Sequence, residues 1–483
     1  MEGLQTFSSQ SPLVSEKMDL YQRAKKYSIE TFTTAALSLL ANASKENLIR
    51  LTYLAEKIPQ KESYQEKIQW IRSLFQTDHP ALAIARRVLR ETHPHHRKKI
   101  ISNLIINQLL MGTNRRKALE EEKGFHPPNA MLISPTMRCN LDCYGCYAGA
   151  YPAEEGLPYE VLDRLVRECR EIGIHLVMVT GGEPFVRKDL LDLFEAHEDT
   201  LFQVYTNATL IDEKMVERFV ALGNVALAIS IEGFREETDA RRGKGHFDRV
   251  VRVMRWLKEA GLFFAVSTTQ TSKNTDLLTS DAFIDFLVEQ GCILLWNFHY
   301  IPIGRDPDLS LMATPEQRNR SRERLEYFRA TKPMLFVDFW NDGCLTGGCI
   351  AGGRKYFHVN ARGDLEPCVF CHFASDNIKE KSLVEALNSP LFQEFRSRQP
   401  LSNNLFRSCP LIDHPEKGRE IALQHAKYFT HEGAERLFTE FAPAIDANAK
   451  AYGEIAEAAW EKKTRVQDEQ PYDKGKKVVG KHG

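Results

Sequence analysis

The chain has 483 residues, of which 43% are apolar and 27% charged, the proportions of soluble globular protein. This composition excludes a mostly disordered chain, a collagen-like fibre and a coiled-coil rod, and no apolar run approaches the ~20 residues that a membrane span needs. The net charge of −1 hides an asymmetry, because residues 1–128 carry 20 Lys and Arg against 13 Asp and Glu. The chain start lacks a basic stretch followed by an apolar core, so we expect a cytoplasmic protein.

Residues 1–128 are predicted to form a helical domain, because Leu, Ala, Lys, Arg and Glu recur at helical spacing between prolines. Within it, residues 86–117 hold nine basic residues and one acidic residue around an apolar stretch. Such a helix either packs its apolar side on the rest of the fold, or lies on the inner face of an anionic membrane. Aromatic residues are not interleaved with the charges, so we expect no nucleic-acid partner.

Residues 129–335 alternate short apolar runs with amphipathic helical stretches. The runs lie at Met131–Ser134, Ile174–Thr180, Phe202–Thr206, Val225–Ile231, Phe263–Thr268 and Ile293–Tyr300. Six strand–helix pairs in series predict an α/β fold with a parallel sheet. Six pairs are too few to close an eight-fold barrel, so we expect a partial (β/α)6 TIM-like barrel, with its chemistry at the loops that follow the strands.

Three cysteines, Cys139, Cys143 and Cys146, follow the first predicted strand with the spacing C-x3-C-x2-C. Three thiolates on one tight loop can hold three irons of a [4Fe–4S] cluster, which leaves the fourth iron open for chemistry. The alternative is a structural zinc site, but no further Cys or His adjoins the loop as a fourth ligand.

This loop resembles the signature of the radical S-adenosylmethionine (SAM) enzymes, and the resemblance extends from about Met131 to Arg329. It implies that the open iron binds SAM and that the cluster cleaves SAM reductively to methionine and a 5′-deoxyadenosyl radical, which abstracts hydrogen from a substrate. The positions that match the family's SAM contacts are Gly145, Gly181, Gly182, Glu183, Asn207, Ser230, Glu232 and, from its place alone, Thr268. One departure is Gly145, which stands where the family commonly has an aromatic residue.

A Gly- and Cys-rich segment, residues 336–415, is too irregular to add strands to the barrel. Its spacing from Cys349 through Gly363 to Cys368 resembles the opening of the SPASM extension, which carries auxiliary [4Fe–4S] clusters. Two such clusters would need about seven or eight ligands, so we expect one auxiliary cluster, as in the shortened "twitch" version. Four of five cysteines would hold it: Cys344, Cys349, Cys368, Cys371 and Cys409. Structural zinc suits four thiolates equally well and is the alternative.

The remaining segments carry weaker signals. Cys169 and Cys292 stand apart from both groups and are predicted to be core residues. Residues 416–462 are predicted to be helical, and residues 463–483 to be a disordered tail.

Function follows from the resemblance only in outline. It implies a reducing partner such as flavodoxin or ferredoxin. The SPASM resemblance suggests a peptide or protein substrate, and the basic segment 86–117 a lipid or isoprenoid. A different class, an iron–sulfur electron carrier or assembly protein that never cleaves SAM, fits the elements after the second and fourth strands poorly.

Overall fold

The computed structural model describes residues 44–56, 62–77, 79–153 and 156–469, and the chain divides into two compact units at Gln76/Thr77. In the first unit, α2 (Lys45–Glu56) packs against α3 (Glu62–Gln76). Arg72 of α3 donates to Thr52 Oγ1 at 2.8 Å and pairs with the Glu56 carboxylate. The parts of the predicted helical domain before residue 44 lie outside the described residues.

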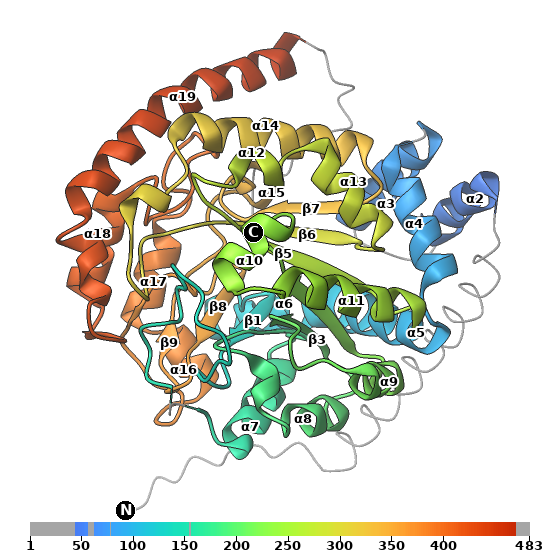
Figure 1. The fold of residues 1–483 in the computed structure, drawn as a ribbon, viewed down its shortest axis with the longest axis horizontal. Coiled ribbons are helices and arrows are strands. Elements are labelled where there is room, and N and C mark those ends of the chain that lie inside the picture. Colours follow the sequence, from blue (N-terminus) through green and yellow to red (C-terminus); the bar gives the residue numbers. More distant parts are fainter. Residues whose placement is uncertain (1–43, 57–61, 78, 154–155, 470–483) are drawn as a thin grey trace, which may run out of the picture. The chain divides into compact units, whose positions relative to one another are not determined.

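The six predicted strands are confirmed within two residues at each end, and each is followed by a helix, as the alternation predicts. The strands are β1 (Ala130–Ile133), β2 (Leu176–Val179), β3 (Leu201–Thr206), β4 (Val225–Ser230), β5 (Phe264–Gln270) and β6 (Leu294–His299). The helices are α7 (Tyr159–Glu171), α8 (Leu190–Ala196), α9 (Glu213–Leu222), α11 (His246–Glu259), α13 (Asp281–Glu289) and α14 (Pro315–Thr331). Neighbouring strands pair in parallel, and the helices lie outside the curved sheet (Figure 1).

The sheet has nine strands rather than six, in the order β7-β6-β5-β4-β3-β2-β1-β8-β9. β7 (Leu335–Asp338) extends the sheet beyond β6. On the opposite side, β8 (Tyr356–Val359) pairs in parallel with β1, and β9 (Leu365–Glu366) pairs antiparallel with β8. The expectation that the Cys-rich segment adds no strand to the barrel is therefore wrong. The run Tyr356–Val359 lies in a Gly-rich segment without the alternation of strands and helices that marks the barrel, and its pairing with β1 makes it a strand.

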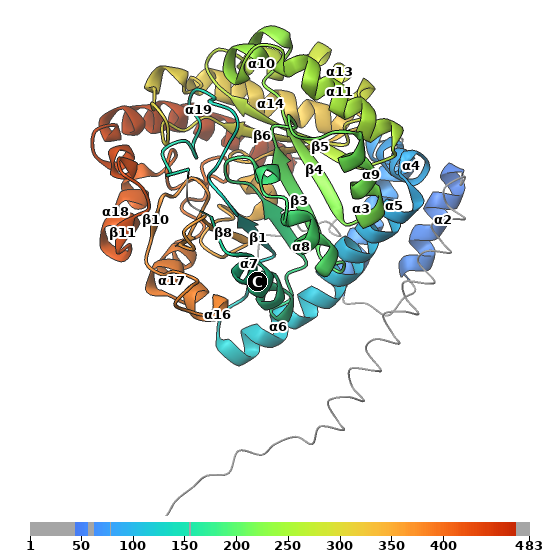
Figure 2. The ribbon, with the colours of Figure 1, turned by 60° about the horizontal axis from the view of Figure 1, so that its bottom comes forward.

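A row of helices covers the amino-terminal end of the strands: α4 (Pro80–Glu91), α5 (Pro94–Ile101), the π-helix η1 (Ser102–Met111) and α6 (Gly112–Lys123) (Figure 2). Their polar side chains bond the backbone carbonyls that precede successive strands. Asn103 donates to Glu198 O at 3.0 Å, and Arg87 donates to Cys292 O at 3.1 Å. These helices belong to the same compact unit as the barrel, residues 77–483, although the sequence groups them with residues 1–128.

The basic segment packs on the barrel through a face that mixes amide and aliphatic side chains, since Ile106 is buried beside Asn103 and Asn107. Asn103 and Asn107 of η1 are buried against the barrel, whereas Ile105 and Leu109 are 42% and 45% exposed. The carbonyls at the end of the barrel need donors, which amide side chains provide and aliphatic ones do not. Among the described residues no helix is both long enough and apolar enough to cross a membrane.

The C-terminal part surrounds the β1–β8 side of the sheet. It contains α15 (Gly343–Thr346), the antiparallel pair β10 (Phe373–Ala374) and β11 (Tyr428–Phe429), and the helices α16 (Leu383–Leu387), α17 (Pro390–Ser397), α18 (Pro415–His425) and α19 (Ala442–Glu469). Helix α19 packs along α14 and continues past Lys462, where the tail was expected to begin. Lys463 reaches Glu326 of α14 at 2.9 Å, and this pair helps to hold the last turns in place. Cys169 and Cys292 are fully buried, as predicted.

Candidate active site

One cavity lies where the parallel strands end, and most of the predicted site residues surround it. Its walls include Cys139, Cys143, Cys146, Gly145, Gly181, Gly182, Asn207 and Ser230. These residues come from four different strand–helix loops, which the parallel sheet brings to one edge. The three thiols therefore face the same space as the residues that follow β2, β3 and β4. We call this space the first cavity.

Glycines allow the cysteine loop, residues 139–146, to lie close to its neighbours. A Cβ at Gly182 would lie 2.2 Å from the carbonyl oxygen of Arg138, and a Cβ at Gly304 would lie 2.3 Å from that of Cys146. The Gly182 N–H donates to Thr136 O at 3.0 Å. These two glycines therefore serve the packing of the cysteine loop, because only glycine permits so close an approach of backbone to backbone.

Gly145 departs from the family pattern for a reason that the fold supplies. Its φ is +61°, and a Cβ there would lie 2.7 Å from Cε2 of Tyr300, the residue that follows β6. A larger side chain at position 145 would displace the Tyr300 ring. Tyr300 also lines the first cavity, so an aromatic ring is present beside the third cysteine, but it comes from another strand.

Glu183 is 1% exposed and holds the turn after β3. Its carboxylate accepts from Thr206 Oγ1 at 2.8 Å and from the Asn207 N–H at 2.7 Å. Burial raises the pKa of this carboxyl, and these hydrogen bonds oppose the rise. The Asn207 side chain in turn donates to Asn140 Oδ1 at 2.9 Å, on the cysteine loop. The backbone of Gly181 and Gly182, and not the Glu183 side chain, lines the first cavity.

Glu232 is also 1% exposed, and it is held by two arginines of α10 (Arg235–Arg242), a helix that the sequence analysis missed. Arg241 Nη1 and Arg242 Nη2 lie 2.6 and 2.5 Å from Glu232 Oε1. Burial alone would raise the pKa of this carboxyl, but the two guanidinium groups hold it below its usual value. Both arginines line the first cavity. Two cations against one carboxylate leave this wall with net positive charge.

Thr268 does not line the first cavity. Thr268 is fully buried, and its hydroxyl donates to Asn297 Oδ1 at 3.2 Å, within the sheet. Its neighbours Ser267 and Thr269 line the first cavity instead. Side chains alternate along a strand, so the residues on either side of Thr268 face the opposite way.

A second cavity is lined by four of the five C-terminal cysteines: Cys349, Cys368, Cys371 and Cys409. Burial raises the pKa of the Cys349 thiol to about 12. Tyr356 of β8 lies 2.6 Å from Cys368 Sγ through its hydroxyl. Cys344 is not part of this wall and packs instead against the buried group formed by Phe406, Tyr452 and Ala456.

Aromatic side chains separate the two cavities. Trp296, Phe339 and Phe370 line both of them. The rings of Phe339 and Phe370 meet edge to face, with their centroids 6.1 Å apart. Seven thiols thus surround two neighbouring cavities, three in one and four in the other, and thiolates are the ligands that iron–sulfur clusters take. Within the described ranges no three His, Cys, Asp or Glu side chains converge closely enough to hold a single metal ion.

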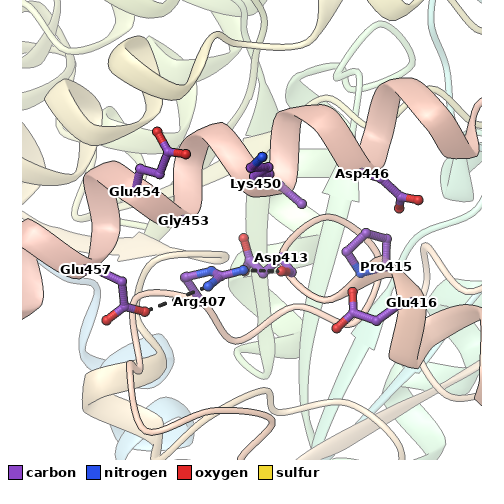
Figure 3. Close-up of a pocket in the computed structure, with 10 residues that line it drawn as sticks. Arg407, Asp413, Pro415, Glu416, Asp446, Lys450, Gly453, Glu454 and Glu457 are labelled. Atoms are coloured by element: carbon purple, nitrogen blue, oxygen red, sulfur yellow. Dashed lines mark hydrogen bonds and ion pairs between the residues drawn. The ribbon is translucent and has the colours of Figure 1, made fainter.

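A third hollow lies between α19 and residues 407–416, and Figure 3 shows its charged side chains. Arg407 Nη2 donates to the Asp413 carbonyl at 3.0 Å, and Arg407 Nη1 lies 3.8 Å from Glu457 of α19. A Cβ at Gly453 would lie 3.0 Å from the Arg407 guanidinium, so the glycine makes room for it. Through these two contacts Arg407 links α19 to the segment that carries Cys409.

Comparison with known proteins agrees with this arrangement. Residues 133–271 match the radical SAM superfamily, and residues 349–410 match SPASM, an iron-sulfur cluster-binding domain. The AdoMet-dependent heme synthase of Methanosarcina barkeri is 27% identical, over 57% of this chain and 86% of that protein. Mycofactocin maturase MftC of Mycolicibacterium smegmatis is 28% identical, over 64% of this chain and 81% of that protein. The crystal structure of Streptococcus suis SuiB bound to S-adenosylmethionine shares the fold with a TM-score of 0.52 at 18% identity, over 68% of this chain and 87% of that one.

Proposed function

We propose that this enzyme, which carries a radical SAM domain followed by a SPASM iron–sulfur domain, cleaves SAM at a [4Fe–4S] cluster held by Cys139, Cys143 and Cys146. The bound cluster and SAM supply a 5′-deoxyadenosyl radical, which abstracts hydrogen from a substrate. The observation that carries the proposal is the convergence on one cavity of three thiols and the loops that follow β2, β3 and β4. An electron carrier would need the thiols but not the rest of this cavity.

The chain's own residues can orient SAM in three ways. Arg241 and Arg242 leave net positive charge on one wall after pairing with Glu232, which suits the carboxylate of SAM. The backbone of Gly181 and Gly182 lies open to the cavity without intervening side chains. Ser230 adds a hydroxyl to the lining of the first cavity. Glu183 acts on the turn that positions Asn207 rather than directly on the cavity.

We further propose that the second cavity holds one auxiliary [4Fe–4S] cluster on Cys349, Cys368, Cys371 and Cys409. Four thiols around one space supply the full ligand set of such a cluster. Cys344 does not line this cavity and packs instead against Phe406 and Tyr452, so we leave it out of the proposed set.

For the substrate we propose a peptide or protein, since MftC is a maturase and one SuiB structure is described as bound to the precursor peptide SuiA. A tetrapyrrole is the second candidate, which the similarity to AdoMet-dependent heme synthases favours. A titration with heme, followed by its absorbance, tests the second candidate directly. Saturable binding that SAM strengthens would support the tetrapyrrole over the peptide.

The decisive experiment is SAM cleavage by the anaerobically reconstituted protein with dithionite as reductant, measured as 5′-deoxyadenosine. We expect product that disappears in Cys143→Ala and persists in Cys292→Ala, whose thiol is fully buried in the barrel core. Replacing dithionite by reduced flavodoxin or ferredoxin tests the reducing partner. If no 5′-deoxyadenosine forms and calorimetry shows no SAM binding, the chain is an iron–sulfur carrier.

A further inference from the structure

Arg241, near the end of α10, joins Glu232 to the cysteine loop. The residue is 8% exposed, and each nitrogen of its guanidinium has a partner. Nη1 donates to Glu232 Oε1 at 2.6 Å. Nε donates to the Tyr144 carbonyl at 3.3 Å, and Nη2 donates to the Gly145 carbonyl at 3.4 Å. These are the two residues between the second and third cysteines of the loop, so Arg241 holds the stretch of chain that separates two thiols.

The carboxylate that anchors Arg241 is held from several sides. Glu232 Oε1 also accepts from Arg242 Nε at 2.9 Å and from Arg242 Nη2 at 2.5 Å. Glu232 Oε2 accepts from the Thr269 N–H of β5 at 3.0 Å. The backbone carbonyl of Glu232 accepts from Asn274 Nδ2 at 3.1 Å. The cysteine loop is therefore linked through Arg241 to the ends of β4 and β5.

The two arginines carry the same charge but make different contacts. Within the described part of the chain, the hydrogen bonds of the Arg242 side chain go to Glu232 alone. Arg241 bonds both Glu232 and the loop. Substitutions at the two positions can therefore separate the effect of the charge from the effect of holding the loop.

Both guanidinium groups act electrostatically on the thiols of the loop. Burial raises the pKa of the Cys143 thiol, and the charges of Arg242 and Arg241 oppose this rise. Burial alone would lower the pKa of Arg241, but Glu232 and the thiols of the loop hold it above its usual value. Arg241 thus stays charged although it is buried. Two cations against one carboxylate leave one positive charge in excess beside the loop.

Water and salt screen this excess charge only weakly. Glu232 is 1% exposed, and the Arg242 side chain is 11% exposed. Buried charges act over a longer range than charges that face the solvent. Arg235, at the start of the same helix, is the contrasting case, because its side chain is 58% exposed and paired with Asp248 at 2.5 Å. We therefore expect the charge of Arg235 to have no effect at the loop.

We propose that Glu232, Arg241 and Arg242 set the reduction potential of the cluster on the cysteine loop by holding one excess positive charge beside it. The inference rests on the proposed function, since this cluster gives the electron that cleaves SAM. The step is a one-electron transfer in which a flavodoxin or ferredoxin is oxidised, the cluster is reduced, and no bond forms or breaks. A nearby positive charge favours the reduced form, because cluster potentials depend on the surrounding charge and hydrogen bonds. Arg241 is in addition a positioning residue, because it holds the loop that carries the thiols.

The test is a redox titration of the full chain after anaerobic reconstitution, followed by electron paramagnetic resonance of the reduced cluster, without SAM. The signal that is missing in Cys143→Ala belongs to the cluster on the loop. Arg241→Met should make this cluster at least about tenfold harder to reduce, which lowers its potential by about 59 mV. Glu232→Gln should raise the potential, because it removes a negative charge. The matched control, Arg235→Met, should leave the potential unchanged.

Two further variants separate the charge from the contact with the loop. Arg241→Lys keeps the positive charge but lacks the guanidinium fork. Its potential should stay close to that of the native chain, while its iron should pass to a chelator faster. If Arg241→Met binds no iron at the loop, Arg242→Met takes its place, because it removes the same charge and leaves Tyr144 and Gly145 their donor.

Two results would overturn the inference. One is a native potential in Arg241→Met, or in Arg242→Met where that variant takes its place. The other is a shift of the same sign in Arg241→Met and Glu232→Gln, which charge cannot produce. A native chain without a signal that depends on Cys143 lacks the cluster, and the proposed function then fails together with this inference. A native chain that cleaves SAM while the potentials of the variants do not move refutes this inference alone.

Discussion

The assignment of the second cavity can be tested through its iron content. Three thiols line the first cavity and four line the second, so the native chain should bind about eight irons in two [4Fe–4S] clusters. Cys371→Ser removes a ligand from the second cavity and should leave about four irons. Cys344→Ser removes a thiol that packs against Phe406 and should leave about eight. Iron, zinc and acid-labile sulfide are measured after anaerobic reconstitution, together with the visible absorbance of the clusters.

The matched pair of variants separates the assignment from a general loss of stability. Both serines replace C-terminal cysteines that are at least partly buried, so a nonspecific effect should appear in both. The ligand set would be refuted if Cys344→Ser also lost about four irons, or if Cys371→Ser kept about eight. Zinc in place of the second set of four irons would refute the auxiliary cluster and leave the ligand set intact.

Three further predictions concern the first cavity and the barrel end. Gly182→Ala places a methyl group 2.2 Å from the Arg138 carbonyl oxygen, so it should lower both the iron content of the first site and the melting temperature. In the control Gly156→Ala the new methyl group has no contact closer than 3.5 Å, and neither quantity should change. Arg242→Met should weaken SAM binding, measured by calorimetry, by about tenfold or about 1.4 kcal/mol. The control Arg235→Met removes an exposed ion pair with Asp248 and should leave the SAM affinity within about twofold. Equal effects of the two variants would contradict the role of the positively charged wall. Burial lowers the pKa of His96 to about 4, so the unfolded chain binds a proton at His96 more readily than the folded chain does. The free energy of unfolding should therefore fall as the pH drops from 6.5 towards 4, by up to about 1.4 kcal/mol per pH unit. In His96→Gln this slope should be smaller, and an unchanged slope would show that other groups cause it.

The local sequence was sufficient for the features that depend on neighbours in the chain. The spacing of Cys139, Cys143 and Cys146 after a short apolar run indicated the cluster loop, and alternating strands and helices indicated the parallel sheet. Each of these signals lies within a few residues, because one loop carries the thiols and each strand–helix unit has its own apolar period. The matches of residues 133–271 to the radical SAM superfamily and of residues 349–410 to SPASM agree with these signals, and the partial barrel is confirmed.

The tertiary structure decided what depends on pairing between distant segments. β8 became a strand because it lies beside β1, and Arg241 and Arg242 became part of the site because α10 brings them to Glu232. Nothing in a charged helix reveals a buried partner, so these arginines could not be found from their neighbours.

The same reason explains the fine assignments. Thr268 is a candidate from its place at a strand end alone, because which side chains of a strand face the cavity is set only by pairing across the sheet. The separation of Cys344 from the four thiols of the second cavity likewise depends on which residues the fold brings into contact. The sequence by itself therefore indicated the cluster loop, the parallel sheet and the class of enzyme, because ligand spacing and strand period are local. The tertiary structure decided which side chains share each cavity, because burial and contact are properties of the folded chain.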